Sequence, residues 1–425
     1  MREMKDSGNQ WIGIIPCGWS IDRFKYCTIL YTGNSIKDEH KNDYEDAFFA
    51  KPYISSKDIN RLFSTINYEN GLYIKNNDYS FRVARKNDIL MCIEGGSAGK
   101  KKALLNQDVC FVNKLCCFHS NYKVEHKFLF YYLCNPAYED EFNYNITGMI
   151  GGVSVSRLSN LNIVYPKIDE QKRIAAYLDE QCKKIDEIMV DIQNQINTLE
   201  DYRKSVISET VTRGLNPNVE MKETDMGWIK QVPAKWNISR IASVYELRNE
   251  KVSDNDYQPL SVTMKGVLPQ LDTVAKSDAH DDRKLVRKGD FAINSRSDRR
   301  GSCGIAPCDG SISLINTVLC PLTNMNPIYY NWLFHTTEFA DEFYKWGHGI
   351  VDDLWTTGWQ EMKNILIPVP PVQEQEEIAK YLNEKCADID SIIEVKKAQL
   401  ETIENYKKSL IYEYVTGKKE VPENE

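Results

Sequence analysis

The sequence predicts an α+β protein with two globular domains, separated by two long helices that pair as an antiparallel coiled coil. Three observations support this prediction. A heptad pattern of apolar residues runs through residues 171–212, and the same pattern returns 204 residues later. The segments outside these helices are rich in short apolar runs bounded by turn residues, which is typical of strands.

The first long helix is indicated by apolar residues at every seventh position. This seam consists of Leu178, Ile185, Ile192, Leu199 and Val206. A partner row begins four residues before the seam and consists of Ile174, Gln181, Ile188, Gln195 and Tyr202. Three of these five residues, Ile174, Ile188 and Tyr202, are apolar. No Pro or Gly interrupts residues 171–212, and Arg213-Gly214 supplies a stop. A helix of this length spans roughly 60 Å.

The second long helix is a copy of the first. With a shift of 204 residues, 22 of the 47 residues at positions 166–212 are identical. The second seam contains Leu382, Ile389, Ile403 and Leu410. Neither helix can bury an apolar seam alone, so we expect the two helices to pair with each other. The alternative is that each helix packs separately on its own domain.

The opening segment of the chain also occurs twice. Lys5-Asp6-Ser7, Trp11 and Trp19 have counterparts in Lys222-Glu223-Thr224, Trp228 and Trp236, at an offset of 217 residues. The chain is therefore a tandem duplication whose second copy is 13 residues shorter. We place the first globular domain at 1–165, the central helix at 166–214, the second globular domain at 215–369, and the C-terminal helix with its tail at 370–425.

Short strands and helices alternate inside the two globular domains. Candidate strands are residues 88–93, 109–112, 161–164, 290–293 and 365–367. Aromatic helical segments lie at 128–133 and, in the second copy, at 328–333. This mixture predicts α+β domains. Because the domains differ in sequence far more than the helices do, we expect two similar scaffolds with different surfaces.

Composition narrows the class of protein. The chain has 425 residues, 42% of them hydrophobic, which excludes global disorder. The first ten residues are polar and no apolar run approaches the length of a membrane span, so we expect a cytoplasmic protein without a signal peptide. Twelve scattered cysteines favour free thiols, and no metal site is expected. The net charge of −8 argues against a surface that coats nucleic acid throughout, but allows local basic patches.

Catalytic motifs are weak. Asn135-Pro136-Ala137-Tyr138 resembles the Asn-Pro-Pro-Tyr box of amino-methyltransferases, but it follows a helical stretch, and Pro at the start of a helix is the simpler reading. No phosphate-binding glycine-rich loop of the nucleotide-binding type is present. Asp352-Asp353 is an isolated acidic pair. The sequence therefore indicates binding rather than catalysis.

Two polar loops rich in cations follow equivalent strands of the two domains, at residues 94–102 and 294–301. Gly and Ser allow the backbone to approach a phosphate closely, Lys supplies point charges, and Arg supplies bidentate donors for phosphate or guanine. The predicted DNA-binding residues of these loops are Ser97, Lys100, Lys101 and Lys102 in the first, and Ser295, Arg296, Arg299 and Arg300 in the second.

Further candidates for DNA contact lie outside these loops. The loops that precede the last short elements of each domain, at 148–154 and 347–350, are rich in glycine. The additional predicted residues are Lys57, Arg61, Ser154, Arg157, Arg283, Lys284, Arg287, Lys288 and His348. The alternative for every one of these residues is an ordinary solvated loop.

Together these features resemble the specificity subunit of type I restriction-modification systems. The resemblance rests on the opening Lys5-Asp6-Ser7 with Trp11 and Trp19, and on the duplicated helix signature. That signature reads Pro166, Glu170-Gln171, Ile174-Ala175 and Leu178 in the first copy, and Pro370, Glu374-Gln375, Ile378-Ala379 and Leu382 in the second. The order of domain, helix, domain and helix covers the whole chain.

The resemblance implies a function. The globular domains correspond to target recognition domains, each reading one half of a bipartite, asymmetric DNA target, and the helices correspond to a spacer whose length sets the gap. Two DNA methyltransferase subunits and restriction endonuclease subunits are the implied partners. The subunit itself is implied to be non-catalytic, because S-adenosylmethionine, ATP and Mg are used by the partner subunits.

Other classes of function stay open at this point. The chain is alternatively a coiled-coil adaptor whose globular domains bind proteins. A catalytic methyltransferase or nuclease is a further alternative, and it requires a cofactor site that the sequence does not reveal. An orphan subunit that supports only DNA methylation keeps the family but not the restriction activity.

Overall fold

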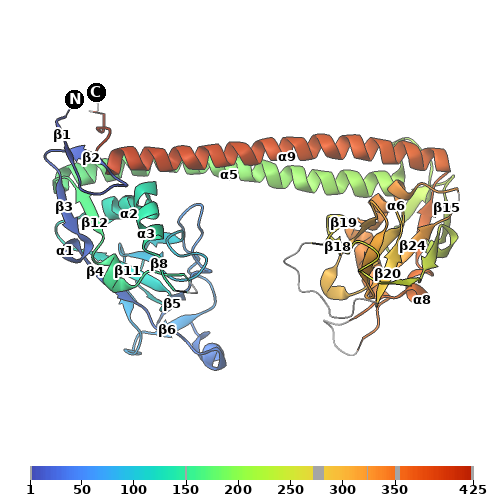
Figure 1. The fold of residues 1–425 in the computed structure, drawn as a ribbon, viewed down its shortest axis with the longest axis horizontal. Coiled ribbons are helices and arrows are strands. Elements are labelled where there is room, and N and C mark those ends of the chain that lie inside the picture. Colours follow the sequence, from blue (N-terminus) through green and yellow to red (C-terminus); the bar gives the residue numbers. More distant parts are fainter. Residues whose placement is uncertain (1, 149–150, 271–281, 323, 350–354, 423–425) are drawn as a thin grey trace. The chain divides into compact units, whose positions relative to one another are not determined.

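The computed structural model describes residues 2–148, 151–270, 282–322, 324–349 and 355–422. It contains two compact units, one formed by Met1–Asn194 with Lys397–Glu425 and the other by Gln195–Lys396. Each unit combines one globular domain with part of both long helices (Figure 1). The α+β class predicted from the sequence is confirmed.

The centre of the first unit is a four-stranded antiparallel sheet in the order β4-β11-β8-β9. These strands are β4 (Thr28–Thr32), β8 (Ile89–Cys92), β9 (Lys102–Leu104) and β11 (Leu115–Ser120). Ile89 and Met91 enter one hydrophobic core, whereas Leu90 and Cys92 enter a second core. Successive side chains of a strand point to opposite faces, so the sheet is covered on both faces and β8 is apolar throughout.

Helices α2 (His126–Cys134) and α3 (Pro136–Tyr144) contribute to the first of these cores, and a second sheet contributes to the other. The order of that sheet is β6-β5-β10-β7. Its strands are β5 (Ala50–Ile54), β6 (Tyr73–Lys75), β7 (Val83–Ala84) and β10 (Val109–Phe111). The remaining elements are β1 (Met4–Asp6), β2 (Ile14–Pro16), β3 (Ser20–Arg23), α1 (Phe24–Cys27), η1 (Asp38–Tyr44), α4 (Val155–Leu158) and β12 (Asn162–Tyr165).

The second unit repeats this plan. Its central sheet has the order β16-β24-β21-β22. The strands are β16 (Tyr245–Arg248), β21 (Phe291–Asn294), β22 (Cys303–Ile305) and β24 (Asn316–Pro321). Phe291 and Ile293 share a core with helices α6 (Pro327–Phe334) and α7 (Thr337–Lys345). Ala292 belongs to a separate core, so this sheet is also covered on both faces.

Smaller sheets complete the second unit. β17 (Lys251–Val252), β20 (Arg283–Val286) and β23 (Gly310–Ser313) form one of them, and β18 (Leu260–Thr263) pairs with β19 (Gly266–Pro269). The remaining elements are β13 (Met221–Glu223), β14 (Gln231–Pro233), β15 (Asn237–Arg240), η2 (Ile241–Ser243), η3 (Ser297–Arg299), α8 (Trp359–Met362) and β25 (Leu366–Val369).

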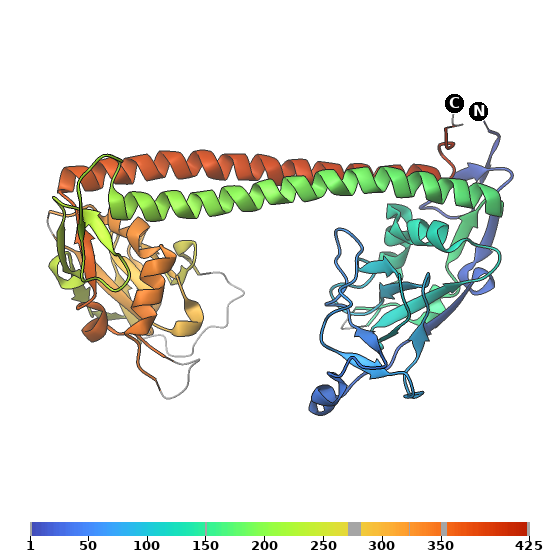
Figure 2. The same ribbon diagram turned by 180° about the vertical axis from the view of Figure 1, so that it is seen from behind.

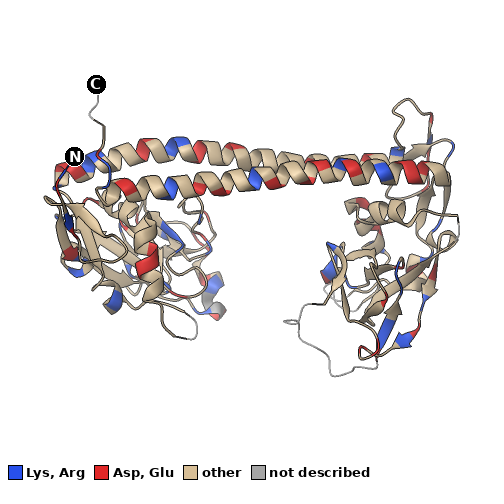
Figure 3. Ribbon diagram, turned by 45° about the horizontal axis from the view of Figure 1, so that its top comes forward, with Lys and Arg blue, Asp and Glu red and all other residues tan. Residues whose placement is uncertain are grey.

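The two long helices are α5 (Ile168–Arg213) and α9 (Val372–Val415). They lie side by side in both views (Figure 1 and Figure 2). In the first unit Lys407 Nζ lies 2.6 Å from Asp186 Oδ1, and in the second unit Arg203 Nε lies 3.0 Å from Asp390 Oδ1. Later residues of each helix therefore meet earlier residues of the other, so the predicted antiparallel pairing is confirmed. Acidic and basic residues are interspersed along both helices (Figure 3).

The predicted seam is largely buried, but in the predicted partner row Ile174 is buried and the later apolar members are not. Leu178, Ile185, Ile192, Leu382, Ile389 and Leu410 are buried, and Leu199 and Ile403 are half-buried. Ile188 and Tyr202, in the predicted partner row, are 49% and 47% exposed. The row that is buried with the seam lies four residues after it, at Cys182, Met189 and Ile196, and one heptad earlier at Ala175. Positions four apart in either direction share a helix face, and the small Ala and Cys concealed which side of the seam was apolar.

The two chain ends are tied together in the first unit. Lys418 Nζ donates to the carbonyls of Ile12 and Ile14, and Arg2 pairs with Glu420. Gly417, two residues after the end of α9, has φ +72°, and a Cβ there would clash with Pro16 Cδ. In the second unit the corresponding junction joins the end of α5 to the opening segment of the domain through the continuous chain. There Gly214, directly after α5, has φ +76°, and a Cβ would lie 3.3 Å from Trp236.

Replacing Gly417 with Ala is expected to destabilise the first unit by about 1–3 kcal/mol, because the residue has a left-handed conformation and lies against Pro16. Chemical denaturation of the full chain measures the loss. Gly18→Ala is the control, because Gly18 has no positive φ and open space around it. Equal stability of the two variants would contradict the close packing at Gly417.

The corrected partner row makes a prediction for two adjacent residues. Met189 is fully buried, whereas its neighbour Ile188 is half exposed. Met189→Ala is expected to lower the free energy of unfolding by about 2–5 kcal/mol. Ile188→Ala is expected to change it by about 0.5 kcal/mol or less. If chemical denaturation showed a larger loss of stability for Ile188→Ala than for Met189→Ala, the partner row predicted from the sequence would be correct after all.

Candidate nucleic-acid interface

In each unit the loop after the central strand lies beside the glycine-rich loop that was predicted separately. In the first unit Glu94 pairs with Gly152, which also pairs with Thr147. In the second unit Arg296 pairs with Thr356, which also pairs with His348. Backbone bridges thus join three segments in the same pattern in both copies. Met149, Ile150, Ile350 and the pair Asp352-Asp353 lie outside the described residues.

The cations of the first loop have unequal roles. Lys100 is exposed, and its backbone N–H donates to the carbonyl of Ser97. Lys101 is half-buried and its Nζ donates to the carbonyl of Ser56 at 2.7 Å. That contact holds the loop against the turn that carries the exposed Lys57. Lys57 and Lys100 are therefore the cations of this surface that present their charges to solvent.

The prediction is wrong for Lys102. Its side chain is only 3% exposed, and Nζ donates to the Leu133 carbonyl at 2.6 Å and to Glu139 Oε1 at 2.8 Å. The residue belongs to β9 rather than to the loop, and its side chain turns toward α2 and α3. A buried ammonium with two protein acceptors is not available to a phosphate.

The glycine-rich loop of the first unit ends at a helix cap. Ser154 is the N-cap of α4 and accepts the backbone N–H of Arg157 at 3.4 Å. The Arg157 guanidinium donates through Nη1 to the Asn145 carbonyl and to Thr147 Oγ1. Ser154 and Arg157 are both exposed. Arg157 thus braces the start of this loop while part of its guanidinium faces solvent.

The arginines of the second loop all have acidic partners within the same unit. Arg296 makes a bidentate pair with Asp298, with distances of 2.9 and 3.2 Å. Arg299 Nε lies 3.8 Å from the same carboxylate, and Arg300 pairs with Asp341. These side chains are half-buried or exposed, so a phosphate that binds them must replace a carboxylate.

The prediction is also wrong for Ser295. It is 6% exposed, and its Oγ lies 3.0 Å from Thr317 Oγ1. Its carbonyl accepts the backbone N–H of Thr357. Ser295 therefore ties the end of β21 to its neighbours and has a structural role.

Arg283 and Lys284 lie on β20 and are half-buried. Arg283 donates to Ser311 Oγ through Nε and to the Ser311 carbonyl through Nη2. Lys284 Nζ donates to the Asn316 carbonyl at 2.7 Å. Burial lowers the pKa of both side chains. Arg287, Lys288 and His348 are exposed.

A large cavity lies beside these loops in each unit. In the second unit a cavity of about 1300 Å³ is lined by Arg283, Arg299 and Arg300, together with Asn294 and Asn316. The two asparagines were not predicted, because Asn at the end of an apolar strand resembles ordinary turn punctuation. They lie in adjacent strands and face each other in the register.

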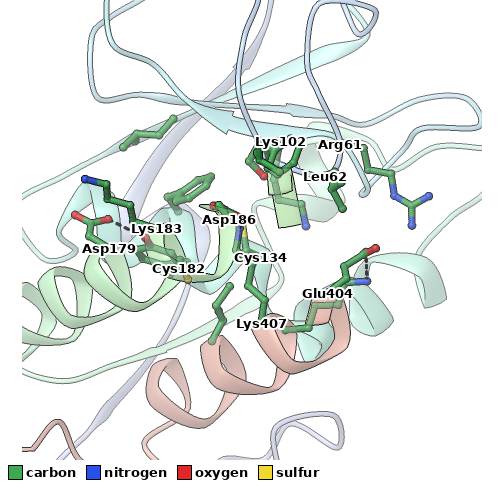
Figure 4. Close-up of a pocket in the computed structure, with 18 of the residues that line it drawn as sticks. Arg61, Leu62, Lys102, Cys134, Asp179, Cys182, Lys183, Asp186, Glu404 and Lys407 are labelled. Atoms are coloured by element: carbon green, nitrogen blue, oxygen red, sulfur yellow. Dashed lines mark hydrogen bonds and ion pairs between the residues drawn. The ribbon is translucent and has the colours of Figure 1, made fainter. Parts of the chain in front are cut away.

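The first unit has a cavity of about 660 Å³ of a different kind. It lies between the loop carrying Arg61, the residues Lys100 and Lys102, and the two long helices (Figure 4). The ion pair between Lys407 and Asp186 lies in its wall. Carboxylates and ammonium groups alternate around this space, so its lining is nearly balanced in charge.

The motif that suggested catalysis has a structural role. Asn135 is fully buried and caps α3, its Oδ1 accepting the backbone N–H of Tyr138 at 3.0 Å. Within the described ranges, no group of three or more His, Cys, Asp or Glu is arranged to hold a metal ion. No helix in the described part of the chain is long and apolar enough to cross a membrane.

Comparison with known proteins gives this geometry a context. A family described as the type I restriction modification DNA specificity domain matches residues 27–198. The chain is 27% identical over 341 residues to a protein assigned as the type I restriction enzyme MjaX specificity subunit of Methanocaldococcus jannaschii, covering 75% of this chain and 73% of that protein. It is 24% identical over 365 residues to the MjaVIII specificity subunit of the same organism, covering 79% and 80%.

The chain is thus similar to type I restriction enzyme specificity subunits over most of its length. A structure solved for the assembly and conformational transition of a type I restriction-modification system has the same fold, with a TM-score of 0.64 at 16% identity. The match covers 95% of this chain and 99% of the chain in that structure. The matched family is described as a DNA specificity domain, so the two loop surfaces are the candidate DNA contacts.

In the first unit, Lys100 and Lys102 form a matched pair of substitutions. Lys100→Ala is expected to reduce the slope of log K against log salt for duplex DNA by about 0.9, as when one phosphate contact is lost. Lys102→Ala is expected to leave that slope unchanged and to lower stability by about 1–3 kcal/mol, because it leaves a buried carbonyl unpaired. Fluorescence anisotropy across a salt series, together with denaturation, separates the two roles. A smaller slope for Lys102→Ala alone would reverse the assignment.

Proposed function

We propose that this chain is a DNA specificity subunit that recognises a bipartite, asymmetric DNA target, with one globular domain reading each half-site. The observation that carries the proposal is the duplicated pair of loops. Both copies use the same pattern of backbone bridges, through Gly152 in one and Thr356 in the other. The first copy presents lysines and the second presents arginines, so one scaffold offers two sets of donors. Different donors favour different base pairs.

The undefined gap between the half-sites is proposed to depend on the paired helices. α5 and α9 are uninterrupted helices of 46 and 44 residues, and their pairing is supported by an ion pair in each unit. A buried seam resists bending better than a flexible linker does. This supports a target in which the number of undefined base pairs is constant.

The chain is proposed to scaffold its catalytic partners without catalysing a reaction itself. S-adenosylmethionine, ATP and Mg are then used by the methyltransferase and endonuclease subunits. The motif that resembles a methyltransferase box instead caps helix α3 through Asn135, which supports a non-catalytic role for this chain. Burial raises the pKa of the Cys303 thiol, which makes this thiol a poor nucleophile although it lies 3.7 Å from His335 Nε2.

Two matching apolar patches on the helices support docking of two copies of one partner. The first unit exposes Ile188 and Tyr406, which are 49% and 59% exposed. The second unit exposes their counterparts, Ile392 and Tyr202, each 47% exposed. Large apolar side chains that recur at equivalent surface positions are typical of protein interfaces. We propose that each patch contacts one methyltransferase subunit and that endonuclease subunits join the resulting complex.

The double substitution Ile188→Asp with Tyr406→Ala is expected to remove one of two methyltransferase subunits from the complex. Both side chains are exposed, so the chain itself should keep its stability within about 0.5 kcal/mol. The second patch is untouched and serves as an internal control. Native mass spectrometry counts the bound subunits, and retention of both would contradict the assignment of this patch.

The test of the proposed function is co-expression of the chain with its methyltransferase partner in a host that lacks DNA methylation. Single-molecule sequencing then maps the modified bases. An asymmetric motif of two short defined blocks around a constant gap is the expected result. A soluble complex that produces no new methylation would contradict the proposal and favour a protein-binding adaptor.

Replacing Arg296, Arg299 and Arg300 with Ala is expected to relax only one of the two defined blocks, by about 10-fold or more in discrimination. The same methylation map measures this effect. The first domain serves as the reference, because its block should stay unchanged. Equal weakening of both blocks would mean that this loop is not a local reader.

A further inference from the structure

Corresponding positions of the two central sheets differ in a way that folding does not explain. In the first unit Cys92 on β8 pairs with Leu115 on β11, and both side chains are buried in an apolar core. In the second unit the equivalent pair is Asn294 on β21 and Asn316 on β24. The shared register fits an apolar pair, yet the second unit carries two carboxamides there.

Asn316 is held in an unfavourable environment. It is 4% exposed, its Nδ2 donates to the Ser313 carbonyl at 3.1 Å, and its Oδ1 has no hydrogen-bond partner. A buried acceptor without a partner destabilises the folded state, because it has lost its hydrogen bond to water. Leucine at the equivalent position of the first unit avoids this cost. Such a group in a native protein requires an explanation beyond packing.

Asn294 supplies the complementary group. Its Oδ1 accepts the backbone N–H of Arg296 at 3.1 Å, which fixes the carboxamide. No acceptor for its Nδ2 is found among the residues that the structure describes. Both asparagines line the cavity of about 1300 Å³, and Arg299 and Arg300 line it as well. A fixed donor and an unsatisfied acceptor therefore lie on neighbouring strands beside two cations.

We propose that Asn294 and Asn316 are the base-reading pair of the second domain. Nδ2 of Asn294 donates to a base acceptor, and Oδ1 of Asn316 accepts from an adjacent amino group. Adenine presents this combination in the major groove, as N7 beside the N6 amino group. Arg299 and Arg300 then contact neighbouring nucleotides of the same half-site. This inference rests on the proposed function and assigns one specified base to one half-site.

The test uses the residues that the first unit carries at the same positions. The double variant Asn294→Cys with Asn316→Leu is co-expressed with the methyltransferase partner, and its methylation motif is mapped. One adenine position of one block is expected to lose discrimination by about 10-fold or more, while the other block stays unchanged. Asn237→Leu is the control, because Asn237 is exposed on β15 and does not line the cavity.

A second variant keeps the proposal testable if the double variant is unstable. Asn294→Asp replaces the donor with an acceptor, so the preference at the same position is expected to move from adenine toward cytosine, whose amino group donates. An unchanged motif in a stable variant would overturn this inference and leave the proposed function intact. A wild-type complex without a bipartite motif would instead contradict the proposed function itself.

Discussion

The rest of the structure depends on the buried face of the two long helices. Leu178 and Cys182 of α5 share one core with Tyr131 of α2 and with Leu410 of α9. The same arrangement recurs in the second unit, where Leu382 and Cys386 of α9 share a core with Val206 of α5. The apolar face of each helix therefore contacts both its partner helix and a globular domain. A change in that face affects the domain as well as the pairing, because close-packed cores transmit strain.

Sequence patterns predicted the parts of the fold that depend on local periodicity. The heptads of residues 171–212, their repeat, and the strands at 88–93 and 290–293 all follow from spacing along the chain. The partner row failed because positions four before and four after a seam are equivalent by spacing alone. The predictions for Lys102 and Ser295 failed because residue type does not reveal where a loop ends. In a strand, a shift of one residue also moves a side chain to the opposite face.

The asparagine pair was beyond sequence reasoning for a different reason. Asn294 and Asn316 are 22 positions apart and become neighbours only through the antiparallel pairing of β21 and β24. Their unusual character is visible only against Cys92 and Leu115, because the first unit shows what the same register holds when packing alone decides. The two domains have diverged so far in sequence that this correspondence needs the sheet. A duplicated chain thus contains an internal reference for separating structural residues from functional ones.

The acidic partners of the arginines bear on specificity. A free cluster of three arginines attracts any phosphate backbone, and such non-specific binding competes with the target. Here Asp298 and Asp341 already occupy the guanidinium groups of Arg296, Arg299 and Arg300. When a DNA phosphate replaces one of these carboxylates, the gain in free energy is only the difference between the new ion pair and the old one. Charge alone therefore provides little net affinity. Base contacts in the cavity must then supply the remainder, which favours DNA that carries the correct sequence and agrees with a chain of net charge −8.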